Sequence, residues 1–261
     1  MNSKTHPQID WILIENQIGL NEVRIARDFI KWAEEINCIP PNDFTQRFIN
    51  GEPIQYILGI GFFHKYYFKL NTATLIPRPE TEELVELISS ENKNLNDLKV
   101  LDIGTGSGCI PITLLLENPS WTAVGVDIQQ GAVRCAYDNS VEHNIEIKVK
   151  FEVLDILKEI PMYDANIWVS NPPYIPNTEF SIIDDKVKNF EPKIALFVED
   201  ALIFYKRIIK LFLNNSHAKQ LWFECHQNFV EETAKIALEL NLDTKKIGDC
   251  SGNLRFLLIK K

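Results

Sequence analysis

A glycine-rich turn between two apolar segments is the feature that most constrains how this chain folds. The run at 99–103, Lys-Val-Leu-Asp-Ile, is typical of a buried strand, and Gly-Thr-Gly-Ser-Gly follows at once at 104–108. The next segment, 109–116, can form a helix, because Pro111 is tolerated in a first turn. A strand, a glycine turn and a helix in this order bring backbone N–H groups close to a ligand. The pattern therefore predicts an α/β ligand-binding unit.

The spacing of these glycines argues against a nicotinamide dinucleotide site. The dinucleotide fingerprint needs a further glycine at position 109, where this chain has Cys109. The GxGxG turn is a weak signal by itself, so the ligand has to be inferred from the other strands.

Polar side chains lie at or near the carboxyl ends of four of the expected strands. The strand at 122–127 ends in Asp127, about 20 residues after the glycine turn, where α/β nucleotide folds place an acid for ribose hydroxyls. Runs at 147–154 and 165–169 are followed by Asp155 and Asn171, and Asp102 lies in the first strand. One such residue is as often a helix cap as a ligand contact. Because open α/β sheets bind ligands at the carboxyl ends of their strands, we expect all four side chains to converge on one crevice.

Asn171-Pro172-Pro173-Tyr174 follows the strand at 165–169 and points to chemistry on nitrogen. Two consecutive prolines restrict the backbone and remove two N–H donors, which leaves carbonyl groups free to accept. An amide side chain and an aromatic ring stand on either side of them. The tetrapeptide is thus a rigid cradle for a planar NH2 group, with acceptors for its hydrogens and a ring for its face.

Together, the glycine turn, Asp127 and the Asn-Pro-Pro-Tyr segment resemble class I S-adenosylmethionine-dependent methyltransferases that act on amino or amide nitrogen. Two upstream segments narrow the match: Gly-Glu-Pro-Ile-Gln-Tyr-Ile-Leu-Gly at 51–59 and Leu-Ile-Pro-Arg-Pro-Glu-Thr-Glu-Glu-Leu-Val-Glu at 75–86. They resemble the release factor glutamine methyltransferase family, from about residue 50 to the C-terminus. This family methylates the side-chain amide nitrogen (N5) of the glutamine in the Gly-Gly-Gln loop of class I peptide chain release factors.

The resemblance implies a cofactor, a substrate and a set of site residues. The cofactor is S-adenosylmethionine, which leaves as S-adenosylhomocysteine. Its expected contacts are Gly104, Thr105, Gly106, Ser107, Gly108, Asp127, Asp155, Ile156 and Asn171. Asn171, Pro172 and Tyr174 are the expected catalytic residues, and with Pro173 they are expected to hold the substrate glutamine. Arg78, between two prolines, is expected at the edge of the active site or between domains, with no partner assigned.

Three regions are expected along the chain. Residues 1–50 predict a small helical domain, which grips the protein substrate in the family, and residues 51–76 predict a β-hairpin connector. In the first region two apolar stripes at helical spacing over 23–36 predict a helix buried over a wide arc. Residues 77–261 predict the methyltransferase domain, a seven-stranded, mostly parallel Rossmann-like sheet with helices on both faces and the last strand antiparallel. The acidic stretch at 175–200 is expected to be an irregular loop that can act as a lid.

Charge and cysteine usage narrow the partners and the compartment. The net charge is −9, without a basic cluster, which favours a basic protein over a nucleic acid as substrate. The five cysteines are scattered and the histidines form no ligand pattern, so we expect reduced thiols and no metal. With no apolar run like a signal peptide or a membrane span, we expect a cytoplasmic protein. A monomer is expected as well.

Two alternatives stay open from the sequence. A nucleic-acid methyltransferase acting on adenine N6, cytosine N4 or guanine N2 would use the same cradle, because an exocyclic amine is also a planar NH2 group. The aromatic and lysine residues at 62–70 would then stack on bases. A non-catalytic binding protein with this fold is the second alternative.

Overall fold

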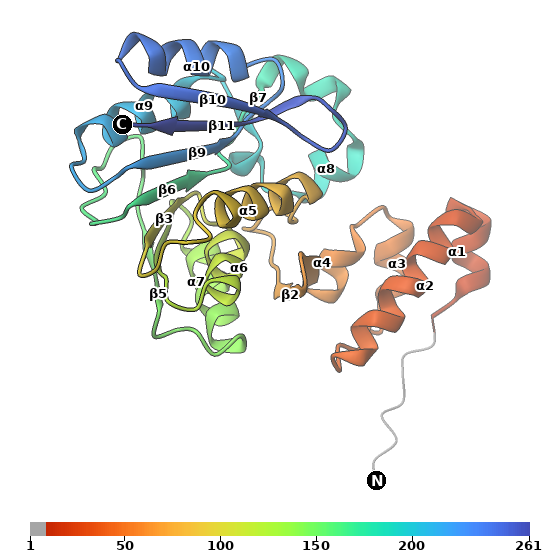
Figure 1. Ribbon diagram of the computed structural model, residues 1–261. Coiled ribbons are helices and arrows are strands. Elements are labelled where there is room, and N and C mark those ends of the chain that lie inside the picture. The colour runs from red at the N-terminus through yellow and green to blue at the C-terminus, as the bar shows by residue number, and fades with distance from the viewer. Residues whose placement is uncertain (1–8) are drawn as a thin grey trace.

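The computed structural model describes residues 9–261, and a seven-stranded sheet forms its centre (Figure 1). The strands are β3 (Lys99–Ile103), β4 (Thr122–Asp127), β5 (Val149–Val153), β6 (Ile167–Ser170), β9 (Gln220–Glu224), β10 (Asp243–Gly248) and β11 (Leu254–Lys260). Their order across the sheet is β10-β11-β9-β6-β3-β4-β5. Neighbours from β5 to β9 pair in parallel, and β11 is antiparallel to both of its neighbours. The prediction of a mostly parallel sheet with the last strand antiparallel is confirmed.

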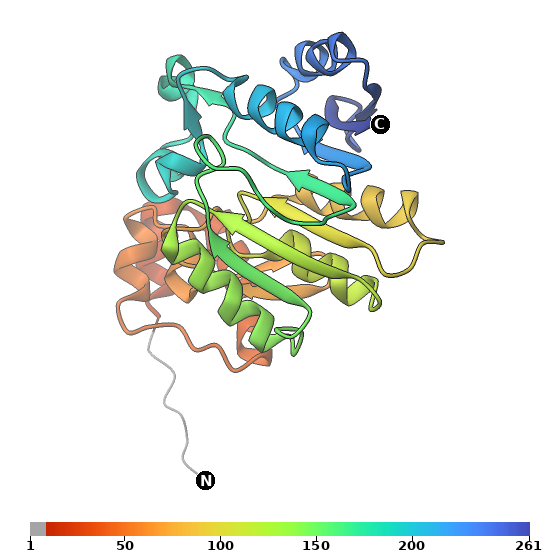
Figure 2. The same ribbon diagram turned by 90° about the vertical axis from the view of Figure 1, so that its left-hand side faces the viewer.

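Helices cover both faces of the sheet, as Figures 1 and 2 show. One face packs α5 (Pro79–Glu91) and α6 (Cys109–Glu117) against alternate residues of the central strands, including Val100, Val169 and Trp222. The other packs α9 (Ile203–Asn214) and α10 (Val230–Glu239) against the intervening residues, such as Leu101 and Trp168. Because both faces are buried, the inner strands read as continuous apolar runs rather than alternating ones.

Helix α7 (Gln130–Glu142) follows β4 and packs on β4 and β5. Strand β4 has the predicted bounds of 122–127. Strand β5 is shorter than the expected strand at 147–154. Ile147 is 89% exposed because it precedes the point where pairing with β4 begins.

Four helices form the N-terminal part of the described chain: α1 (Trp11–Ile18), α2 (Leu20–Glu35), α3 (Phe44–Ile49) and α4 (Ile54–Leu58). They share a small core of their own, in which Ile14, Val23 and Phe44 are buried. The first stripe of α2 is buried as expected, whereas the second is only partly covered: Phe29, Trp32 and Ile36 are half-buried, and Ile25 is 49% exposed. Too few elements surround α2 to cover both sides. The first eight residues of the predicted 1–50 domain lie outside the described residues.

A β-hairpin joins these helices to the sheet domain, formed by β1 (Ile60–Phe63) and β2 (Tyr66–Lys69). His64 in its turn has a φ of 57°, a left-handed conformation that glycine would adopt at lower cost. Phe63 and Phe68 are buried against α5 and α6. The boundary near residue 50 stays a prediction, because α4, within the expected connector, packs on the N-terminal helices.

The aromatic and lysine residues of this hairpin are occupied by contacts within the chain. Lys65 and Tyr66 bond Glu117 at the end of α6, at 2.9 and 2.8 Å. Tyr67 and Lys69 bond Glu142 of α7, at 2.6 and 2.7 Å. These polar bonds fix the hairpin on the sheet domain, so the pattern at 62–70 gives no support to base stacking.

The segment after β6 is folded, so the expectation of an irregular stretch at 175–200 is wrong. It contains β7 (Ile175–Pro176), the 3-10 helix η1 (Asn177–Ile182), α8 (Asp185–Phe190), the 3-10 helix η2 (Lys193–Ala195) and β8 (Phe197–Val198). β7 and β8 pair in parallel. Phe190 packs beside Tyr56, Leu70 and Ile76, and Lys186 lies 3.3 Å from Glu22 of α2. Over residues 9–261, no helix combines the length and apolar character that a bilayer crossing requires.

The packing of β11 gives a stability prediction. Phe256 of β11 is fully buried in the core cluster that also contains Leu84 and Val85 of α5, so Phe256→Ala should lower the free energy of unfolding by about 3–5 kcal/mol. Leu238→Ala on α10, where the side chain is 56% exposed, should change it by less than about 0.5 kcal/mol. Urea unfolding followed by tryptophan fluorescence measures both, and equal losses would contradict this account of the core.

Candidate active site

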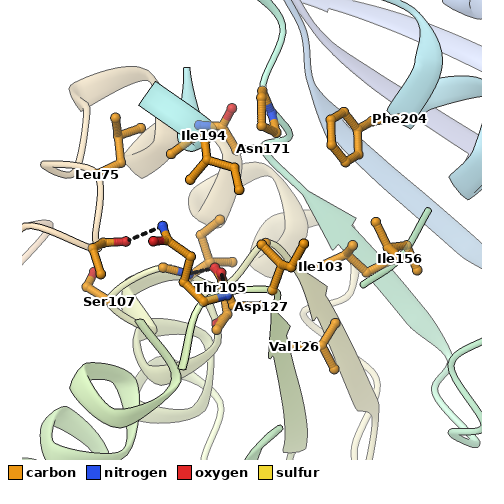
Figure 3. A pocket seen from close by; sticks show the side chains of 18 of the residues that line it. Leu75, Ile103, Thr105, Ser107, Val126, Asp127, Ile156, Asn171, Ile194 and Phe204 are labelled. Carbon is orange, nitrogen blue, oxygen red and sulfur yellow. Dashed lines mark hydrogen bonds between the residues drawn. The ribbon is translucent and has the colours of Figure 1, made fainter. Parts of the chain in front are cut away.

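A cavity of about 320 Å³ opens at the carboxyl ends of β3, β4 and β6 (Figure 3). Of the residues expected at the site, it is lined by Gly104, Thr105, Gly106, Ser107, Asp127, Asp155, Ile156, Asn171 and Pro173. Figure 3 shows Asn171 on the side of the cavity opposite Thr105, Ser107 and Asp127. The parallel register therefore brings the predicted strand ends together around one space.

The glycine turn is held in shape by backbone conformation and by Asp127. Gly104, Gly106 and Gly108 all have positive φ, between 54° and 79°, which glycine adopts without a steric penalty. The Asp127 carboxylate accepts the N–H of Gly106 at 3.0 Å and that of Gln129 at 2.9 Å. Asp127 thus links the two loops that border the cavity.

Gly108 lies behind the turn and does not line the cavity. A Cβ at this position would stand 3.0 Å from the Ala136 Cβ of α7 and 3.2 Å from the Phe151 ring of β5. The structure therefore gives Gly108 a packing role between α6 and its neighbours.

Buried polar atoms without partners gather at this turn. Thr105 Oγ1 and Ser107 Oγ have no hydrogen-bond partner within residues 9–261, and both residues line the cavity. Below them, both carboxylate oxygens of Asp102 are likewise unpaired in the described chain. Burial raises the pKa of Asp102 to about 7. Free hydroxyl groups beside glycine N–H groups suit the polar end of a ligand with carboxylate and ammonium groups.

Asp155 and Ile156 stand at the other end of the cavity. Asp155 accepts the Leu157 N–H at 3.0 Å, and its bond with Lys158 lowers the pKa of its carboxyl. Ile156 is buried, and Phe204 lines the same cavity, on the same side of it as Ile156 in Figure 3. Phe204, near the start of α9, was not among the expected site residues, because nothing in the sequence indicates that α9 reaches this end of the cavity.

Asn171 follows β6 directly and is tied to two residues that the sequence analysis missed. Its Nδ2 donates to Thr81 Oγ1 at 3.3 Å, and the Thr81 hydroxyl donates to Glu224 Oε2 at 2.7 Å. Glu224 is the last residue of β9, and burial raises its pKa to about 7. Its position at a strand end was the signal that could have identified it, as for Asp127.

A second cavity of about 280 Å³ lies beyond Asn171. It shares Leu75, Arg78 and Asn171 with the first, and Tyr174 lines it. Pro172 is buried and lines neither cavity. The four residues of the expected cradle thus lie together, with Asn171 at the junction of two spaces.

The 175–200 segment forms part of the walls of both cavities. Ile194 and Ala195 of η2 line the first, and Ile183 and Val187 line the second. A partly buried ion pair fixes this segment: Arg78 Nη2 lies 2.6 Å from Glu191 Oε1, and Glu191 is 5% exposed. Glu191 is therefore the partner that the sequence did not identify for Arg78, and the pair stands at the edge of the site. Whether the segment moves as a lid stays a prediction.

The geometry is that of a two-substrate site. The two cavities meet at Asn171, so the site has room for one ligand against the glycine turn and for a second beside Tyr174. No three His, Cys, Asp or Glu side chains within residues 9–261 gather into a group that could hold a metal ion.

Comparison with known proteins gives close sequence relatives. A family model described as "Methyltransferase small domain" matches residues 80–189. The release factor glutamine methyltransferase of Flavobacterium psychrophilum is 42% identical over 216 residues, which cover 80% of this chain and 75% of that protein. Proteins of the same name from Streptococcus pneumoniae and Bacteroides thetaiotaomicron are 40% and 38% identical, and the matches cover 67% and 77% of their lengths.

Solved structures share the fold at much lower identity. The hMettl16 catalytic domain in complex with a MAT2A 3'UTR hairpin superposes with a TM-score of 0.61 at 16% identity, over 74% of each chain. A structure described as human methyltransferase 10 domain containing protein gives 0.55 at 16% identity, over 74% of this chain and 89% of that one. At this identity the likeness concerns the fold alone.

The buried Asp102 carboxyl gives a pH prediction. Because its pKa rises from 3.8 to about 7 in the folded state, the folded chain holds a proton that the unfolded chain releases between about pH 4 and 7. Stability should therefore fall as the pH rises through this window. In Asp102→Asn this fall should be smaller, whereas Asp185→Asn, at an 85% exposed side chain, should leave it unchanged. Denaturant unfolding without cofactor at about pH 5 and pH 7.5 tests this, and equal slopes in all three proteins would contradict it.

Proposed function

This chain belongs to the release factor glutamine methyltransferase family, and on that premise we propose that it methylates the glutamine of the Gly-Gly-Gln loop in class I peptide chain release factors. The methyl group goes from S-adenosylmethionine to the side-chain amide nitrogen. The observation that carries this proposal is Asn171 at the junction of two cavities, one bordered by the glycine turn and one by Tyr174.

The larger cavity fits S-adenosylmethionine by the chemistry of its walls. The unpaired Thr105 and Ser107 hydroxyls suit the polar amino-acid end, and Asp127, with lone pairs left after two N–H bonds, suits the ribose hydroxyls. At the other end, Asp155 offers a polar group to the adenine, and Ile156 and Phe204 offer apolar surface. When bound, the sulfonium supplies an electrophilic methyl group.

The smaller cavity is proposed to admit the glutamine side chain. An amide nitrogen is a poor nucleophile because its lone pair is delocalised into the carbonyl. Asn171 Oδ1 would accept one of its N–H bonds and favour positive charge on nitrogen, and Tyr174 would pack on the amide plane. The Pro172 carbonyl is the proposed acceptor for the other N–H bond, although Pro172 lines neither cavity, so the substrate amide would have to reach past the cavity walls to meet it. Holding the nitrogen in line with the methyl group is a proximity effect, which can supply roughly 7–11 kcal/mol in good cases. As the new N–C bond forms, the S–C bond breaks and the nitrogen becomes cationic; this N-methylated amide cation is acidic enough to lose one proton to water and give the neutral N-methyl amide.

The protein partner is expected to contact both parts of the molecule. The Lys186–Glu22 contact places α2 beside the segment that lines the smaller cavity, so the N-terminal helices are suited to hold a protein whose loop enters there. The net charge of −9 favours a basic partner, such as one that works on the ribosome. We expect this reaction in the cytoplasm, with the enzyme acting as a monomer.

The nucleic-acid alternative has no specific support. The structural likeness to hMettl16 concerns the fold alone, the hairpin lysines pair with Glu117 and Glu142, and the sequence relatives carry the protein methyltransferase name.

The first prediction from this proposal concerns the acceptor. Labelled methyl should pass from S-adenosylmethionine to a purified class I release factor, but not to a release factor whose loop glutamine is changed to alanine. Asn171→Ala should lower the rate at least about 100-fold while the affinity for S-adenosylhomocysteine stays within about tenfold, because Asn171 serves mainly the acceptor. Label on DNA or ribosomal RNA in place of release factor would overturn the proposed substrate.

The second prediction concerns the role of Asp127 in cofactor binding. Asp127→Ala should weaken S-adenosylhomocysteine binding by at least about tenfold, because it removes the acceptor for ribose and for the Gly106 N–H. Asp138→Ala, at a carboxylate paired with Arg134 on the surface of α7, is the matched control and should leave the affinity unchanged. Calorimetric titration measures both, and unchanged binding in Asp127→Ala would remove Asp127 from this role.

A further inference from the structure

The orientation of the Asn171 carboxamide decides whether an oxygen or a nitrogen faces the acceptor. The two ends of a carboxamide are nearly equal in size and opposite in hydrogen bonding, since the oxygen only accepts and the nitrogen only donates. A reversed amide would place two donors against an incoming NH2 group and would repel it. The surroundings of Asn171 must therefore select one orientation.

Asn171 lies beside a buried carboxylate, that of Glu224. β6 and β9 pair in parallel with Ser170 opposite Phe223, so the next residue of each strand, Asn171 and Glu224, are neighbours. Thr81, in the first turn of α5, lies between them. Glu224 is 1% exposed and Thr81 is 4% exposed, so water does not compete for their hydrogen bonds.

The chain of bonds has a direction. A threonine hydroxyl has one hydrogen, and here it is donated to Glu224 Oε2 at 2.7 Å. The Thr81 oxygen is then left with lone pairs alone, so the group facing it at 3.3 Å has to be a donor, the Asn171 Nδ2. Because the nitrogen is held at Thr81 and Asn171 lines both cavities, we infer that its oxygen is the atom available to a ligand there.

We propose that Thr81 and Glu224 are positioning residues that orient the Asn171 carboxamide, with its nitrogen turned inward and its oxygen presented to the acceptor NH2 group. Neither residue needs to touch the substrate for this. The inference rests on the proposed function for its catalytic consequence, while the orientation itself is a property of the chain alone.

The network also gives the rate a pH dependence. Burial raises the pKa of Glu224 to about 7, so its carboxyl gains a proton as the pH falls through that value. A protonated carboxyl can donate to Thr81, which frees the Thr81 hydroxyl hydrogen for the Asn171 oxygen and permits the reversed amide. The rate should fall on the acid side of about pH 7. The titratable and charged groups around Glu224 are Arg255 on β11, Glu80 on α5, Tyr205 on α9, Tyr174 after β6, and the adjacent Cys225.

The test compares Thr81→Val with Thr81→Ser. Valine keeps the shape of threonine but has no hydroxyl, so kcat for release factor methylation should fall at least about tenfold, with S-adenosylhomocysteine affinity close to that of the unmodified protein. The melting temperature should also fall, because the buried Glu224 carboxylate loses a donor. Serine keeps the hydroxyl and should retain kcat within about threefold. Glu224→Gln should remove the acid limb of the kcat–pH profile, because it has no titrating carboxyl.

A second measurement needs no substrate. The Asn171 side-chain NH2 signals, assigned by their loss in Asn171→Asp, should be protected from hydrogen exchange in the unmodified protein and in Thr81→Ser, and exchange faster in Thr81→Val. Equal exchange in all three proteins, or a kcat for Thr81→Val within about twofold of normal, would overturn the positioning role. If the unmodified enzyme transfers no methyl group to release factor, the proposed function fails, while the exchange data still decide the orientation.

Discussion

The parallel register of β4, β3, β6 and β9 is the constraint on which the rest of this structure depends. Asp102, Asp127, Asn171 and Glu224 come from strands far apart in the sequence, and only the register brings their ends to one edge of the sheet. One residue of slip would turn each of these side chains to the opposite face, because successive residues of a strand point to opposite sides. The buried apolar residues on both faces prevent such a slip, so core packing also positions the site.

Buried acids in the site show a consistent electrostatic arrangement. Asp102 and Glu224 are both fully enclosed, and burial raises the pKa of each to about 7. Burial also raises the pKa of Asp127, which accepts two backbone N–H groups. The bond with Lys158 lowers the pKa of Asp155. Enclosed acids cost stability unless a partner satisfies them. Thr81 and Asn171 provide this for Glu224. Asp102 has no hydrogen-bond partner within residues 9–261, so its burial beneath the glycine turn costs stability.

Much of the fold could be predicted from local signals. The glycine turn, the strand ends, the hairpin and the antiparallel last strand follow from periodicity, turn chemistry and family resemblance, and the structure has them where they were expected. The errors concern segments whose environment is not local. The second stripe of α2 is apolar but partly exposed. The acidic 175–200 segment folds because Glu191 pairs with Arg78 and Phe190 packs on Tyr56, and each partner is more than a hundred residues away.

The sequence by itself determined the chemistry at each strand end, because residue type and distance along the chain are enough to identify a glycine turn, a ribose-type acid and a rigid amide cradle. Only the tertiary structure decided which side chains complete them. Thr81 and Glu224 are 143 residues apart, and Phe204 reaches the cavity from a helix on one face of the sheet. These contacts between distant residues depend on the strand register and on helix packing. Both result from the burial of the whole chain, so no single position in the sequence indicates them.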